Sequence, residues 1–461
     1  WQLLVAHSPT VTTRVWHSSR STLFARLAVF ARLAASSLYG IREALQHTRR
    51  SFAPSLLDQN RQMPEDKQEE ETALPEPKQE EVDAGIQLCH KVFILSNPSL
   101  CKDVAALGDE VKQIVLDRDM EALYPGYCEK FGWMVDESAQ AAMKAKNAEK
   151  IKAADEKIKD AEDNLGDSEV REAMLAKAEF FIAVGDRAAA LKAFEACEKK
   201  TVAIGHKMEM VFSVMRLHIF HDDWVNVKTQ IDKLKDLLEQ PGGADWERKN
   251  RLKVYEGVYL MACRDFAGAT VLFLESLSTF TTYELMTYTQ FILYTVVCSV
   301  VSLKRTELKE KVIDSPEVLS VVDHLPGVGA LINSLHECKY RAFMTAFPVV
   351  ADQVLESTWL TKHHRYFLRE ARVMAYGQFL QSYKSVTTAS MAAAFSVSEA
   401  FLDEELSHFI VDGRLNAKID KVNGVLQTNR PDTKNALYQS YIKEGDQLLN
   451  RIQKLSRVID L

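Results

Sequence analysis

The chain has 461 residues, of which 47% are hydrophobic and 26% charged, and it contains only 18 glycines and 12 prolines. This composition excludes a globally disordered or collagen-like protein. So few turn residues argue against an all-β fold, which needs them roughly every 8–12 positions. The net charge of −7 disfavours a general nucleic-acid-binding protein. We therefore expect a predominantly helical protein.

The first 62 residues differ in composition from the rest of the chain. They contain eight arginines, no lysine and two acidic residues, and the arginine-spotted stretch at 23–33 is typical of a mitochondrial transit peptide. The chain begins at Trp1, however, and its first methionine is Met63, which precedes an acidic, proline-containing tract. We expect residues 1–62 to be a non-native or upstream segment and residues 63–85 to be an acidic disordered tail.

From residue 137 onward the chain has the periodicity of helices. Residues 137–165 place small and apolar side chains at alternating three- and four-residue steps, which predicts one long helix. Residues 173–197 then show small residues, an aromatic pair and a Gly-Asp turn that ends at Asp186. This second pattern resembles a tetratricopeptide-type helix–turn–helix unit.

The helix–turn–helix pattern recurs further along the chain. It returns at 217–234, with Asp223 in the turn, and at 259–277, with Asp265 in the turn. Single helix pairs of this size cannot bury their apolar faces unless they stack on neighbours. We therefore predict an N-terminal solenoid of helical repeats over residues 86–264.

Residues 285–303 carry no charged side chain, and the stretch is long enough to span a membrane. Threonine, tyrosine, glutamine and serine interrupt it, and no basic cluster flanks one end alone. We predict a buried helix here and no membrane partner.

Residues 384–428 predict a winged-helix module with a small β-hairpin. A short apolar helix precedes a second helix that has Ser398 as its N-cap and Gly413 in the C-cap position. The runs 415–419 and 425–428 flank an Asn-Gly turn and predict the two strands. The apolar face expected for the second helix comprises Phe401, Leu402, Leu406, Phe409 and Ile410.

The charge of that second helix opposes DNA binding. Its four carboxylates are Glu399, Asp403, Glu404 and Glu405. A helix in the major groove lies beside phosphates and usually supplies cations, but no Lys or Arg occurs between 398 and 411. We expect Arg414, Lys418 and Lys421 of the wing to be solvated, and the module to contact protein rather than nucleic acid.

The segment 433–461 predicts a terminal amphipathic helix. Its two heptad positions hold Tyr441, Leu448 and Leu455, and Tyr438, Gly445, Ile452 and Ile459. We expect this stripe to join a helix bundle with other subunits. The partner-binding residues predicted on it are Leu448, Ile452, Leu455 and Ile459.

No pattern in the sequence predicts catalysis, a cofactor or a metal site. The seven cysteines are widely spaced without a C-x-x-C motif, so neither a disulfide framework nor a thiolate zinc site is indicated. His336-Glu337 begins like a zinc-protease H-E-x-x-H, but Tyr340 replaces the second histidine. His218 and His221 lie in a repeat turn, where we expect no metal. A P-loop and a G-x-S-x-G motif are also missing, so we predict a protein that is not an enzyme and has no small-molecule substrate.

Several blocks of the sequence resemble the PCI-domain subunits of the 26S proteasome lid. They include YRAFMTAFPVVADQVL, HHRYFLREARVMAYGQFLQSY, ELSHFIVDGRLNAKIDKVNGVLQTNRPDTKN and GDQLLNRIQKLSRVI. The resemblance covers essentially Met63–Leu461 and does not extend to residues 1–62. It implies a PCI domain over 265–430, with the winged helix at about 384–428, and a bundle helix over 431–461. Pro348 in a helical stretch and Gly424 in the wing turn depart from the family pattern.

The same resemblance implies a function. A lid subunit of this kind is a non-catalytic scaffold that supports ATP-dependent degradation of ubiquitinated proteins through PCI–PCI and helix-bundle contacts. Its partners would be other lid and base subunits, and its location the cytoplasm and nucleus. The alternative is a PCI scaffold subunit of a related complex, such as the signalosome.

Overall fold

The computed structural model describes residues 82–100, 103–164, 166–243, 245–429 and 433–459. The upstream segment 1–62 and the acidic tail up to residue 81 lie outside the described residues. The end of the expected tail is ordered, because Val82 packs against the core and the Asp83 carboxylate caps the first described helix.

The described chain opens with a small helical unit. Its helices are α2 (Ala84–Ser96), α3 (Val104–Asp117) and α4 (Tyr124–Phe131). They enclose a core of their own that contains Leu88, Val111 and Tyr124. Helix α2 also packs against α8 (Ile204–Phe220), which connects this unit to the repeats.

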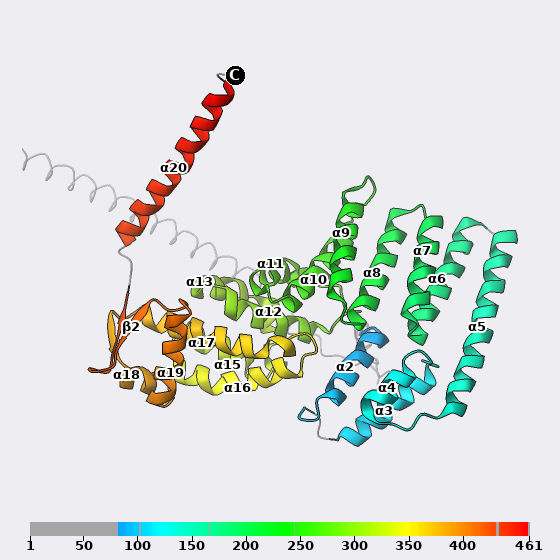
Figure 1. The fold of residues 1–461 in the computed structure, drawn as a ribbon, viewed down its shortest axis with the longest axis horizontal. Helices are drawn as coiled ribbons and strands as arrows, with labels where there is room; N and C mark the ends of the chain where they lie inside the picture. Colours follow the sequence, from blue (N-terminus) through cyan, green and yellow to red (C-terminus); the bar gives the residue numbers. More distant parts are fainter. Residues whose placement is uncertain (1–81, 101–102, 165, 244, 430–432, 460–461) are drawn as a thin grey trace, which may run out of the picture. The chain divides into compact units, whose positions relative to one another are not determined.

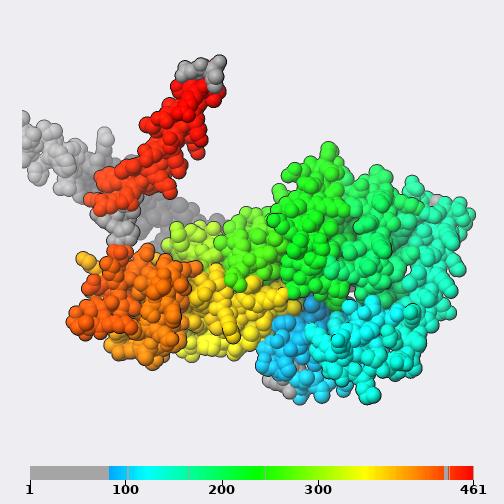
Figure 2. Space-filling model, viewed as in Figure 1, coloured from blue at the N-terminus to red at the C-terminus, as the bar shows by residue number. Residues whose placement is uncertain are grey.

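The long helix and the helix pairs that the sequence predicts are confirmed. The long helix is α5 (Glu137–Asn164), and the pairs are α6 (Asp167–Val184) with α7 (Arg187–Lys200), α8 with α9 (Trp224–Glu239), and α10 (Trp246–Ala262) with α11 (Phe266–Ser276). Successive helices pack on one another in chain order (Figure 1), and their side chains fill the space between the ribbons (Figure 2). Helix α11, which completes the third pair, begins just after residue 264, the position at which we placed the end of the repeats.

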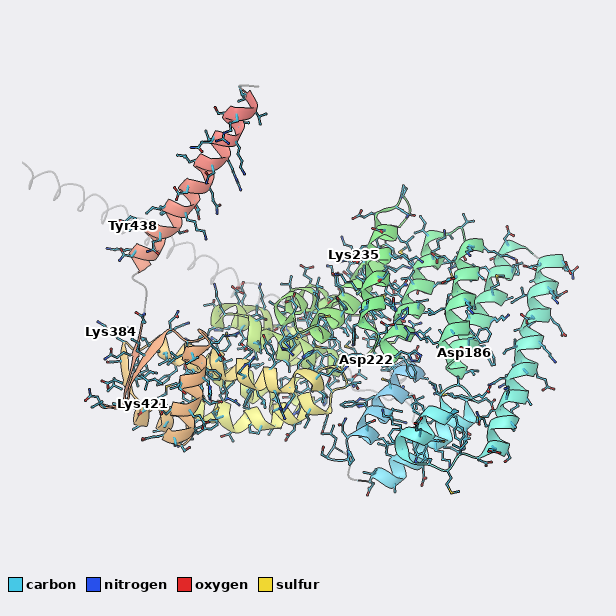
Figure 3. All side chains as sticks on the ribbon, viewed as in Figure 1. Asp186, Asp222, Lys235, Lys384, Lys421 and Tyr438 are labelled. Atoms are coloured by element: carbon cyan, nitrogen blue, oxygen red, sulfur yellow. The ribbon has the colours of Figure 1, made fainter. Side chains whose placement is uncertain are left out.

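The three helix pairs share one turn geometry. A residue with positive φ follows the first helix of each pair within two positions, and these residues are Gly185, Asp222 and Arg264. The next residue is an aspartate whose carboxylate accepts a hydrogen bond from the N–H three residues later; these are Asp186, Asp223 and Asp265. Figure 3 shows Asp186 and Asp222 at the same end of neighbouring pairs. The turn acids recur because each is a helix N-cap.

Helix α12 (Tyr288–Ser302) confirms the buried helix predicted at 285–303. Most of its side chains are buried, and Thr287 and Gln290 form a capping box at its start. None of the helices within the described ranges is both long enough and apolar enough to cross a bilayer. One short helix precedes α12, η1 (Leu277–Thr279). Four short segments follow α12: α13 (Arg305–Leu308), η2 (Lys309–Ile313), α14 (Pro316–Leu319) and η3 (Val322–His324).

The PCI part begins with a helical half. It contains α15 (Val328–His336), α16 (Tyr340–Glu356), η4 (Thr361–His363) and α17 (His364–Leu380). Helix α16 runs through Pro348 without a break, so this departure from the family pattern leaves the helix continuous.

The winged helix is confirmed, with one strand more than predicted. Its elements are β1 (Ser385–Thr387), α18 (Thr388–Phe395), α19 (Glu399–Val411), β2 (Ala417–Asp420) and β3 (Val425–Thr428). The antiparallel sheet has the order β1-β3-β2 and pairs Val386 of β1 with Leu426. Ser398 caps the start of α19 as expected, and Gly413 follows the C-cap residue with a φ of 69°. On the expected apolar face Leu402, Leu406 and Phe409 are buried, whereas Phe401 is exposed.

A cluster of charged side chains ties α2, α8 and α10 to the loop before α12. The Glu284 carboxylate accepts hydrogen bonds from Arg216 Nη1 at 2.5 Å, Arg251 Nε at 2.8 Å and the Tyr255 hydroxyl at 2.5 Å. Arg216 also pairs with Asp83 at 3.2 Å. Burial alone would raise the pKa of Glu284, but the two guanidinium charges outweigh burial and lower the pKa.

Candidate partner-binding surface

The last described helix, α20 (Thr433–Ile459), carries all four predicted partner-binding residues. Every side chain of α20 that the structure describes is exposed. Leu448, Ile452, Leu455 and Ile459 are 57–73% exposed and recur at intervals of three and four residues, so they lie on one face of the helix. The structure therefore brings the predicted residues together on one uncovered stripe.

The stripe is wider than the prediction. Ile442 and Leu449 lie within it, 64% and 57% exposed, and Leu437, Tyr438 and Tyr441 extend it toward the start of α20. Ile442 and Leu449 are seven residues apart, so the heptad spacing that identified the other residues could have found them. The opposite face carries Lys443, Gln447 and Asn450, among other polar residues.

Exposure of this stripe has a large free-energy consequence. A fully buried aliphatic side chain contributes about 1.5–3 kcal/mol relative to an exposed one. The four predicted residues alone would thus gain on the order of 6–12 kcal/mol if a partner covered them completely. Large contiguous apolar patches on soluble proteins commonly mark interaction sites, so the stripe is the candidate partner-binding surface.

The winged helix carries a charged surface, which is a second candidate surface after the apolar stripe of α20. Several of its charged side chains form ion pairs within the chain. Glu405 of α19 forms an ion pair with Arg372 at 2.7 Å and accepts a hydrogen bond from the Tyr376 hydroxyl at 3.0 Å. Lys421 of the wing pairs with Asp403 at 3.1 Å. Burial and the Glu405 carboxylate raise the pKa of Tyr376.

We expected all three wing cations to be solvated, but two of them are paired with carboxylates of the same chain. Besides the Lys421 pair, Arg414 binds the buried Glu370 carboxylate of α17, whereas Lys418 is exposed. A guanidinium held by a buried carboxylate is a poor phosphate ligand, because leaving that partner would strand a buried charge.

The residues that resemble a zinc-protease motif serve a helix–helix turn. Helix α15 ends at His336, and Cys338 turns the chain with a φ of 61°. Glu337 pairs with Lys339 at 2.6 Å, and the Tyr340 ring packs against Phe395. The motif does not form the continuous helix that a zinc-protease site requires.

His218 of the second repeat turn is also engaged by other side chains of the fold. His218 is buried with its Nδ1 3.2 Å from Arg187, which itself binds Asp223, while Asp222 binds Lys362. Burial and the Arg187 charge lower the pKa of His218. Across the part of the chain that the structure describes, no group of three His, Cys, Asp or Glu side chains could hold a metal ion.

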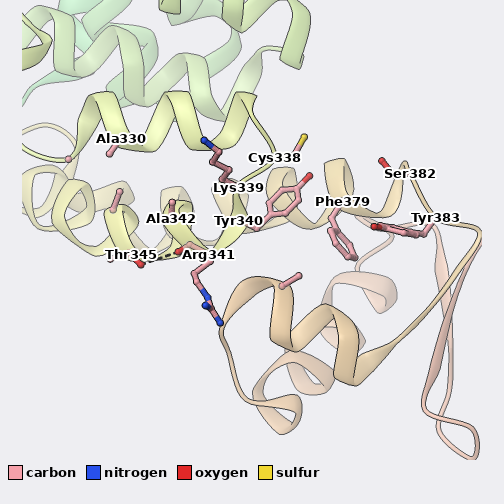
Figure 4. Close-up of a pocket in the computed structure, with 13 residues that line it drawn as sticks. Ala330, Cys338, Lys339, Tyr340, Arg341, Ala342, Thr345, Phe379, Ser382 and Tyr383 are labelled. Atoms are coloured by element: carbon pink, nitrogen blue, oxygen red, sulfur yellow. Dashed lines mark hydrogen bonds between the residues drawn. The ribbon is translucent and has the colours of Figure 1, made fainter.

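A groove of about 990 Å³ lies beside α16 and α17 in the PCI part (Figure 4). Its walls include Ala330, Tyr340, Ala346 and Phe379, with Arg341 at one side. This lining is mainly apolar, which makes the groove a candidate contact surface.

Family models match three successive parts of the chain. The model described as 26S proteasome subunit RPN7 matches residues 136–311, and a PCI-domain model matches residues 341–430. A third, described as the 26S proteasome regulatory subunit RPN7/PSMD6 C-terminal helix, matches residues 438–459. The third match coincides with the exposed stripe of α20.

Curated relatives match over most of their length. The 26S proteasome non-ATPase regulatory subunit 6 homolog of Arabidopsis thaliana is 51% identical over 375 residues, which is 81% of this chain and 96% of the relative. The subunit of Oryza sativa subsp. japonica is 51% identical with the same coverage, and the RPN7 subunit of Saccharomyces cerevisiae is 39% identical over 68% of this chain and 74% of the relative. The chain therefore belongs to the RPN7 family of PCI-domain subunits of the 26S proteasome regulatory particle.

Proposed function

We propose that this chain is a scaffold subunit of the proteasome lid and that α20 is the helix through which it enters the lid's helix bundle. The observation that carries the proposal is the uncovered apolar stripe on α20, which coincides with the family's C-terminal helix. The winged helix supplies the second contact surface, toward neighbouring PCI subunits. The RPN7 family models and the curated relatives given above are proteasome subunits, and the signalosome alternative has no support.

The stripe can be tested by adding charge to it. The double variant Leu448→Asp with Leu455→Asp places two carboxylates where a partner must exclude water. The loss of two buried leucines is worth about 3 kcal/mol or more, which corresponds to a weakening of assembly by about a hundredfold. Tagged chain would be purified gently from cells, and the co-purified regulatory-particle subunits would be quantified by mass spectrometry.

A matched control lies on the polar face of the same helix. Gln447→Asp with Asn450→Asp adds the same charge, and these side chains are off the stripe. This control should assemble like the unaltered chain. Equal recovery of partner subunits with both double variants would refute the role of the stripe, and circular dichroism would show that both remain helical.

We also propose that the subunit acts without catalysis and works in the cytoplasm and nucleus with lid and base partners. The contacts of His218 and Glu337 within the fold support the absence of catalysis, and family membership supports the proteasome partners. The purified chain should not cleave ubiquitin conjugates or peptides. Imaging of the full chain should show cytoplasmic and nuclear signal, and enrichment in mitochondria would contradict the proposed location.

A further inference from the structure

The loop between α18 and α19 places a serine hydroxyl against an arginine side chain. Ser396 directly follows α18, is exposed and has a φ of 56°, so the hydroxyl lies on a tight outward turn. Arg341, the second residue of α16, donates a hydrogen bond from Nε to Ser396 Oγ at 2.7 Å. Figure 4 shows the Arg341 side chain reaching away from α16 toward this loop.

The sequence after Ser396 is acidic. Glu399 stands three residues later, and three further carboxylates follow within α19 before residue 406. A kinase with a basic substrate groove selects serines that precede carboxylates, because charge pattern decides which substrates it accepts. Ser396 therefore combines an exposed hydroxyl, an acidic flank and a cation already in contact.

We propose that Ser396 is a phosphorylation site and that Arg341 binds the phosphate. In this step a protein kinase transfers the γ-phosphoryl group of ATP. The bond from the γ-phosphorus to its bridging oxygen breaks, a bond from phosphorus to Ser396 Oγ forms, ADP leaves, and the hydroxyl proton passes to the catalytic base of the kinase.

Two features of the fold favour the phosphorylated form. The planar guanidinium of Arg341 can replace its one hydrogen bond to the uncharged hydroxyl with two to phosphate oxygens, in which donor and acceptor are both charged. The N-terminus of the 13-residue helix α19 begins three residues after Ser396, and its dipole favours a nearby anion. Glu399 in the first turn of α19 opposes the new charge, so the Arg341 contact has to supply most of the stabilisation.

The modification would link two halves of the PCI part. Arg341 belongs to α16 of the helical half, and Ser396 belongs to the winged helix. A phosphate between them would tie these halves together and place negative charge beside the groove that Arg341 lines. The inference needs no other proteasome subunit, so it can be tested on the full chain alone.

The first test asks whether the folded chain accepts phosphate at this position. The full chain is incubated with ATP and casein kinase 2, which selects an acidic residue three positions after serine, and modified residues are mapped by mass spectrometry. Phosphate on Ser396, and its loss in Ser396→Ala, is the expected result. Modification of the exposed Ser320, which has Asp323 at the same spacing, without modification of Ser396 would overturn the proposal.

The second test asks whether Arg341 binds the phosphate. Chains with phosphoserine genetically encoded at 396 are titrated by phosphorus NMR, where the second phosphate pKa is ordinarily about 6. We expect this pKa to lie about half a unit or more below its value in the Arg341→Gln chain, because a cation favours the dianion. Phosphoserine at 320 is the control and should titrate alike with and without Arg341→Gln. Identical titration at 396 in both chains would overturn the phosphate contact.

Discussion

Removal of the Glu284 charge should destabilise the described fold more than removal of any surface carboxylate. Glu284→Gln keeps the side-chain size but removes the charge that Arg216 and Arg251 share. These two arginines are only 19% and 17% exposed, so water solvates them poorly when their partner is lost. Loss of one member of a fully buried ion pair costs about 3–5 kcal/mol.

The expected cost is smaller here, because each arginine keeps another partner. Arg216 retains Asp83 at 3.2 Å, and Arg251 retains Glu209 at 2.9 Å. We expect Glu284→Gln to lower the free energy of unfolding by about 2–4 kcal/mol. The assay is urea unfolding of the full chain at neutral pH, followed by circular dichroism.

Glu162 provides the control, because its pair with Lys200 is exposed on both sides. Glu162→Gln should change the free energy of unfolding by less than about 1 kcal/mol. Equal effects of Glu284→Gln and Glu162→Gln would refute the reasoning. A cycle with Arg251→Gln adds a second check, since the double variant should lose less stability than the sum of the two single variants.

The same cluster predicts a pH dependence. The pKa of Glu284 is lowered in the folded chain, so its contribution is complete above the unfolded pKa of about 4.3 and disappears as pH falls through the lower folded value. The stability difference between the unaltered chain and Glu284→Gln should therefore shrink in acid. If the stability difference between the two chains stays constant from neutral pH to below pH 4, the ionised Glu284 carboxylate does not contribute as we expect.

Further outcomes follow from the repeats and from the charge pattern. Asp265→Ala removes the N-cap of α11 and should lower the unfolding free energy by about 1 kcal/mol in urea. Gly257→Ala should also destabilise, by about 1–3 kcal/mol, because the new Cβ would lie 2.4 Å from the Phe273 ring, whereas Gly126→Ala meets nothing within 4 Å and should not. The full chain should bind duplex DNA only weakly and non-specifically at about 150 mM salt in an anisotropy titration, and sub-micromolar sequence-dependent binding would show that the electrostatic argument is wrong.

The local signals of the sequence determined the type and order of the elements. Asp186, Asp223 and Asp265 marked the repeat turns because N-capping acts over three residues. Heptad spacing likewise determined the exposed stripe of α20, because side chains three and four residues apart share a helix face whatever surrounds them. The candidate surface could therefore be found before the structure, although Ile442 and Leu449 were overlooked.

Only the tertiary structure decided which distant segments meet. Strand β1 has only three residues, too few for an alternating pattern of polar and apolar side chains to predict it. It is a strand because it pairs with β3, about forty residues later. Arg216 binds both Glu284 and Asp83, and Arg341 binds Ser396. These partners are far apart in the sequence, so local periodicity could not predict the contacts. Local patterns encode the faces of helices, whereas contacts between helices depend on how the apolar faces pack together in the folded chain.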